Sequence, residues 1–166
     1  MSQPLADAIA GLRSADPGAR SSAAQRLARA GPEARGAAVP LVEAAADEDE
    51  EVREWAVAAL EELGPPPAED LDRLAALAED PRRDVAYWAA TLLGRLEHQA
   101  APAVRALTSA LVDHGEAPVR QRAAWALGQI GPAAAPALPA LQQAADSRDP
   151  RLARLARRAI GSIQTG

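Results

Sequence analysis

The chain has 166 residues and a net charge of −5. Because it contains no cysteine, disulfides and thiolate metal sites are excluded. Its length suffices for one domain with a buried core, which we expect to span residues 1–166. The sequence contains neither a basic, apolar leader nor eighteen consecutive apolar residues. This pattern predicts a cytoplasmic protein that does not enter a membrane.

The charge is distributed unevenly along the chain. Residues 43–84 hold 15 acidic residues against four arginines, a net charge of −11, whereas residues 85–166 carry a net charge of +4. An acidic centre is poorly suited to binding a polyanion along its length. We therefore do not expect nucleic acid as the partner.

A repeat of about 33 residues runs through the chain. In chain order the predicted repeats cover about 4–35, 36–67, 68–99, 100–134 and 135–166. In each repeat a short amphipathic segment precedes a longer one, and the longer segments start at Ala19, Val52, Val85, Val119 and Leu152. Four positions after each start the residue is alanine, and eight positions after it is leucine or isoleucine. These positions share one face of an α-helix, so we expect a common buried stripe.

Turn-forming residues separate the helices. Asp16-Pro17 and Asp149-Pro150 lie within repeats, whereas Gly31-Pro32 and Gly131-Pro132 lie between them, where glycine can end one helix and proline can open the next. The pattern predicts an all-α fold, an α-solenoid (superhelix) of about five helix-turn-helix repeats with ten helices. The repeats must stack, because one helix pair cannot bury its apolar face alone.

Residues 119–131, VRQRAAWALGQIG, resemble the second helix of HEAT repeats, especially those of the bacterial phycobilisome-lyase type. The resemblance covers almost the whole chain and implies a superhelix whose second helices line a concave face. Arg26 departs from it, because the other repeats have alanine or leucine at this position, and a polar residue suits a terminal cap. The family also tends to pair an acid in the turn with an arginine four residues later, which here would give Asp16–Arg20, Asp49–Arg53 and Glu116–Arg120.

The sequence carries no recognisable catalytic or metal-binding motif. Its two histidines, His98 and His114, do not form the repeated His-Glu pairs of di-iron hydroxylases of this family. The acidic run at 47–51 lacks the glycine and the spaced ligands of a calcium loop. No phosphate-binding loop or nucleophile motif occurs. We therefore expect no enzymatic activity, no catalytic residue, no cofactor and no metal.

The four aromatic residues all lie in the longer segments of the three middle repeats. Tyr87 and Trp125 take positions 2 and 6 of their repeats, which point away from the buried stripe, so we expect both to be exposed. Trp55 and Trp88 take position 3, at the edge of the stripe, where they either fill gaps in the core or bind a partner. Tryptophan, tyrosine and arginine dominate binding energy at interfaces. The predicted partner-binding residues are Glu54, Trp55, Tyr87, Trp88, Gln121, Arg122 and Trp125.

These features favour a non-enzymatic scaffold or adaptor that binds another protein or a peptide on the concave face. The family resemblance leaves one alternative, an accessory or lyase-type subunit that handles a chromophore or a protein substrate. Two others are nucleic-acid binding through the arginines of the fifth repeat and a designed, consensus-like binder. The uneven repeat spacing favours a natural sequence over a designed one.

Overall fold

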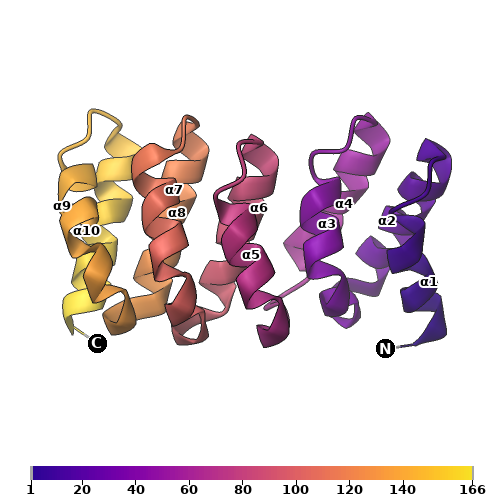
Figure 1. The fold of residues 1–166 in the computed structure, drawn as a ribbon, viewed down its shortest axis with the longest axis horizontal. Helices are drawn as coiled ribbons and strands as arrows, with labels where there is room; N and C mark the ends of the chain where they lie inside the picture. The colour runs from indigo at the N-terminus through magenta and orange to yellow at the C-terminus, as the bar shows by residue number, and fades with distance from the viewer. Residues whose placement is uncertain (1, 166) are drawn as a thin grey trace. The chain divides into compact units, whose positions relative to one another are not determined.

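The computed structural model describes residues 2–165, which form α-helices and 3-10 segments and contain no strand (Figure 1). The prediction of an all-helical repeat fold is confirmed. The helices belong to two compact units, of which one ends at Asp70 and the other begins at Leu71. Within residues 2–165, no helix combines the length and the apolarity that crossing a membrane requires.

The first unit contains two helix pairs. Their bounds are α1 (Gln3–Gly11), α2 (Pro17–Ala30), α3 (Ala38–Ala44) and α4 (Glu50–Glu62). The second helix of each pair is followed by a 3-10 segment, η1 (Gly31–Ala37) or η2 (Ala68–Asp70). The two second helices, α2 and α4, pack against each other.

The second unit contains three helix pairs. Their bounds are α5 (Leu71–Ala78), α6 (Arg83–Arg95), α7 (Val104–Asp113), α8 (Ala117–Ile130), α9 (Leu138–Ala145) and α10 (Pro150–Thr165). The connecting 3-10 segments are η3 (Glu97–Ala103) and η4 (Gly131–Ala137). Helix α8 packs between α6 and α10, and α7 packs between α5 and α9 (Figure 1). The second helices of this unit therefore form one layer, which we call the second-helix layer.

The predicted stripe forms the core of each unit. The alanines at position 4 have no exposed surface: Ala23, Ala56, Ala89, Ala123 and Ala156. The leucines at position 8 are equally buried, namely Leu27, Leu60, Leu93 and Leu127, whereas Ile160 in the last repeat is half-buried. Because these buried alanines are small, the helices around them can pack closely. Arg26 is exposed.

The backbone turns left-handed at the end of the second helix in four repeats. Gly31, Gly64 and Gly131 have φ angles of 53°, 73° and 72° at this point. In the third repeat the same position holds Glu97 with a φ of 50°, the single non-glycine residue with positive φ in the part of the chain that the structure describes. Because a β-carbon is disfavoured in this conformation, Glu97 holds local strain that the glycines avoid.

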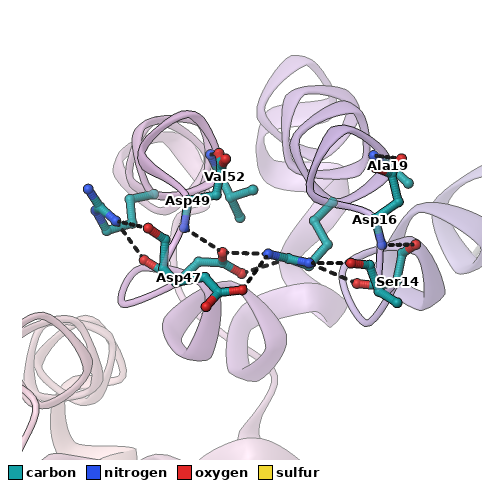
Figure 2. Close-up of polar contacts among 10 residues, drawn as sticks. Ser14, Asp16, Ala19, Asp47, Asp49 and Val52 are labelled. Carbon is teal, nitrogen blue, oxygen red and sulfur yellow. Dashed lines mark hydrogen bonds and ion pairs between the residues drawn. The ribbon is translucent and has the colours of Figure 1, made fainter.

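The acids of the turns within repeats cap helices. The carboxylates of Asp16 and Asp49 accept hydrogen bonds from the N–H groups of Ala19 and Val52, at 3.0 and 3.1 Å (Figure 2). Each acid therefore satisfies a free N–H group at the start of α2 or α4. The acid–arginine pairs at four-residue spacing that the resemblance implied are absent among the contacts of these two aspartates.

The arginines of the same turns bind carbonyl groups instead. Arg53 donates from Nη1 to the carbonyl oxygens of Asp47 and Glu48, at 2.7 and 2.9 Å. Arg120 does the same to the two carbonyls at the equivalent place in its own turn. Side chains in a helix lean toward its N-terminus, so a long arginine near the helix start reaches back over the turn. The predicted pairing was wrong because it took the acid, rather than the turn backbone, as the acceptor.

Arg20 also links the turns of the first and second repeats. Its guanidinium binds both carboxylate oxygens of Asp47, at 2.8 and 2.9 Å, and donates to the carbonyl oxygen of Ser14 at 3.0 Å (Figure 2). Burial raises the pKa of the Asp47 carboxyl, but the hydrogen bonds from Arg20 and from the N–H of Asp49 outweigh burial, and the pKa lies below its usual 3.8. This bidentate pair fixes neighbouring repeats at their turn edge.

In the second unit, two other hydrogen-bonded contacts link neighbouring repeats at their turn edge. The N–H of Glu116 donates to Nδ1 of His114, so Nε2 carries the proton and donates to the carbonyl oxygen of Asp80 at 3.0 Å. Gln121 donates from Nε2 to Oδ2 of Asp149 at 2.7 Å. We call these two contacts and the Arg20–Asp47 pair the turn staples.

Candidate binding site on the second-helix layer

Tyr87 of α6 and Arg122 and Trp125 of α8 form a stacked group, which we call the Arg122 cluster. Cζ of Arg122 lies 4.6 Å from the centroid of the Tyr87 ring and 5.0 Å from that of the Trp125 ring. Nη2 of Arg122 also donates a hydrogen bond to the Tyr87 hydroxyl. Cation–π contacts of this kind each contribute about 0.5–2 kcal/mol, depending on desolvation. The guanidinium is thus held in place by two rings and one hydroxyl.

A pocket of about 300 Å³ lies at this cluster. Its lining comes from three consecutive second helices: Tyr87 from α6, Pro118, Gln121, Arg122 and Trp125 from α8, and Arg151 and Leu155 from α10. The pocket therefore lies on the second-helix layer. Its lining combines apolar surface with two guanidinium groups and includes no acidic residue.

Four of the seven predicted binding residues line this pocket, namely Tyr87, Gln121, Arg122 and Trp125. Trp88 is 9% exposed and packs edge-on against Tyr87, with ring centroids 5.6 Å apart. Of the two readings of Trp88, the structure favours core packing, from which it supports Tyr87. Glu54 is exposed and Trp55 is half-buried, both on α4 of the first unit.

Tyr87 and Trp125 are half-buried, whereas the sequence predicted that they would be exposed. Arg122 covers one face of each ring, and the Trp125 ring also lies against Gly94 of α6. The prediction failed because it considered one helix at a time, whereas each ring also contacts the neighbouring second helix.

Pro118, Arg151 and Leu155 line the pocket but were missed from the sequence. Leu155 stands at position 3 of the fifth repeat, the position that Arg122 takes in the fourth. Pro118 and Arg151 both directly precede a repeat start. Following these two positions from one repeat to the next would have found all three residues.

The two histidines do not lie together in a metal-binding site. His98 is exposed on η3, and both ring nitrogens of His114 are hydrogen-bonded within the turns. Among residues 2–165, no group of three or more histidine, aspartate or glutamate residues could hold a metal ion.

Comparisons with known proteins identify the repeat. The family model for HEAT repeats matches residues 5–85 and 71–161. An engineered protein superposes with a TM-score of 0.68 at 24% identity, over 100% of this chain and 81% of that chain. A designed armadillo repeat protein in complex with the peptide (KR)4 gives a TM-score of 0.68 at 22% identity, over 99% and 83%.

A natural protein of related fold is also similar. The complex of CpcE and CpcF of phycocyanin lyase from Nostoc sp. PCC7120 gives a TM-score of 0.64 at 27% identity, over 100% of this chain and 66% of that chain. A search of curated protein sequences finds no match.

Proposed function

Because the chain belongs to the HEAT-repeat family, we propose that it is a non-enzymatic scaffold that binds a segment of another protein on its second-helix layer. The observation that supports this proposal is the pocket at the Arg122 cluster. Tryptophan, tyrosine and arginine contribute most of the binding energy at protein interfaces, and one pocket here holds all three. Repeat folds of this kind present extended binding surfaces. The similar solved structures include a designed protein with a bound peptide and a two-protein complex.

The proposal of binding without catalysis is supported by the chemistry of the pocket. Its side chains are tyrosine, proline, glutamine, arginine, tryptophan and leucine. None of these pairs a nucleophile with a neighbouring base, the arrangement on which covalent catalysis depends. We also propose Glu54 and Trp55, on α4, as partner-binding residues of the first unit by itself.

The proposal is tested by placing a charge in the pocket without removing the cluster. Leu155→Asp adds a carboxylate to the pocket lining, and Val112→Asp is the matched control, because Val112 is 54% exposed on α7 outside the second-helix layer. Peptides selected from a displayed random library against the full chain serve as probes. We expect Leu155→Asp to weaken their binding at least tenfold and Val112→Asp to leave it unchanged. If both variants weaken peptide binding equally, the second-helix layer is not the binding surface.

A second candidate function is an accessory subunit of a chromophore lyase, supported by the similarity to the CpcE–CpcF complex at 27% identity. A subunit of this type should alter the absorption spectrum of an added bilin, alone or with its partner subunit. A scaffold should leave the spectrum unchanged.

A further inference from the structure

The pocket at the Arg122 cluster has the chemistry to select its partner by charge. Building on the proposed function, we infer that it takes a peptide segment in which an acidic residue neighbours an apolar one. The carboxylate binds Arg122 and Arg151, and the apolar side chain packs on Leu155 and Pro118.

Arg122 has hydrogen-bond donors available for a ligand. A guanidinium has five N–H donors, and the structure records one of them in use, toward the Tyr87 hydroxyl. Within residues 2–165, no carboxylate forms an ion pair with Arg122. Stacking on the two rings fixes the guanidinium plane before any ligand arrives, so little entropy is lost when the remaining donors bind.

Arg151 supplies a second cation to the pocket. It lies in the first turn of α10, is exposed, and lines the same pocket as Arg122. Its backbone N–H binds Asp149, but no ion pair of its side chain is recorded in the described part of the chain. Two guanidinium groups at a pocket without an acidic residue favour a carboxylate, which they can bind through paired hydrogen bonds.

The apolar part of the lining argues for a peptide rather than a nucleic acid. Leu155 and Pro118 offer surface for an aliphatic side chain, whereas binding along a nucleic-acid backbone needs a longer run of cations. One face of each aromatic ring is already covered by Arg122, which leaves less surface on which a base could stack. The net charge of the whole chain, −5, also opposes a polyanion.

The experiment compares arginine variants of the full chain in a random-peptide selection. Arg151→Gln removes a pocket cation, and Arg154→Gln is the matched control, since Arg154 is an exposed arginine of the same helix that does not line the pocket. We expect the wild type to enrich peptides with adjacent acidic and apolar residues. Their affinity should fall about tenfold in Arg151→Gln, as loss of a charged hydrogen bond predicts, and stay unchanged in Arg154→Gln.

The other outcomes separate the two proposals. Enrichment of neutral or basic peptides would overturn the acidic specificity and leave the scaffold proposal standing. If acidic peptides lose equal affinity in both variants, their binding is a diffuse electrostatic effect and the pocket is not the binding site. If no peptide is enriched while single-stranded DNA binds in an Arg151-dependent way, the pocket is a nucleic-acid site. If neither binds, both proposals fail.

Discussion

Trp125 of α8 lies directly against Gly94 of α6. A β-carbon built on Gly94 would come within 2.9 Å of both Cε3 and Cη2 of the indole, and closer still to Cζ3. The indole therefore occupies space that any side chain at position 94 would need. This contact sets the position of a ring that lines the pocket.

Gly94→Ala should destabilise the chain and disturb the pocket together. The new methyl group must displace the Trp125 ring or separate α6 from α8, and overpacking of this kind costs about 1–3 kcal/mol. Urea denaturation measures the loss. Gly161→Ala in α10 is the control, because a β-carbon there meets nothing within 4 Å and alanine favours a helix. If both variants are equally stable, the indole does not lie over Gly94 in solution.

Ala89→Leu and Ala123→Leu should each lower the melting temperature. Both alanines have no exposed surface, so a larger side chain should cost about 1–3 kcal/mol. Ala76→Leu on α5, where the alanine is exposed, should be nearly neutral. An unchanged melting temperature in the first two variants would contradict the buried stripe.

Glu97→Gly should stabilise the chain. Its φ of 50° strains a side-chain-bearing residue, and glycine removes a penalty of about 1 kcal/mol. Chemical denaturation should show the increase. Glu116→Gly, at a backbone position with a φ of −90°, should show no gain. A loss of stability in Glu97→Gly would mean that the glutamate side chain makes a compensating contact.

Asp47→Asn should lower the free energy of unfolding at neutral pH and have little effect in acid. The pKa of Asp47 in the folded chain lies below its usual 3.8, because the bonds from Arg20 and the N–H of Asp49 outweigh the opposing effect of burial. A lowered folded-state pKa means that the carboxylate stabilises the fold above about pH 4 and loses this contribution as the pH falls through the folded pKa.

Urea denaturation at several pH values measures this difference. The gap between wild type and Asp47→Asn should be constant between about pH 5 and 7 and should narrow as the pH falls through the lowered pKa of Asp47 in the folded chain. Glu48→Gln is the control, because the Glu48 side chain is 89% exposed and such surface pairs contribute little. A gap that persists unchanged into acid would assign the effect to packing rather than to charge.

The repeat positions alone were enough to predict the helices and their core. Ala56 and Leu60, for example, are buried because positions 4 and 8 of a helix share one face, and this follows from helix geometry without knowledge of the neighbours. Ile160, at position 8 of the fifth repeat, is half-buried, an exception that one helix considered alone does not predict.

The site could be predicted only in part, because it depends on contacts between repeats. The sequence identified Tyr87 and Trp125 as residues that point away from their own core, and Arg122 as a partner-binding residue beside them. It could not show that Arg122 stacks on the two rings, nor that Arg151 of the next repeat lines the same pocket. These relationships depend on the offset between adjacent second helices.

The turn staples have a consequence for how a repetitive chain avoids misassembly. Repeats, or modules, that share one hydrophobic stripe could each pack against any other repeat. The recorded staples, however, use an arginine–aspartate pair, a histidine–carbonyl bond and a glutamine–aspartate bond. Exchanging the fourth and fifth modules would separate His114 and Gln121 from their acceptors and leave the apolar stripe intact. The polar turn edge thus distinguishes the stapled neighbours from other repeats, a distinction that the uniform core cannot make.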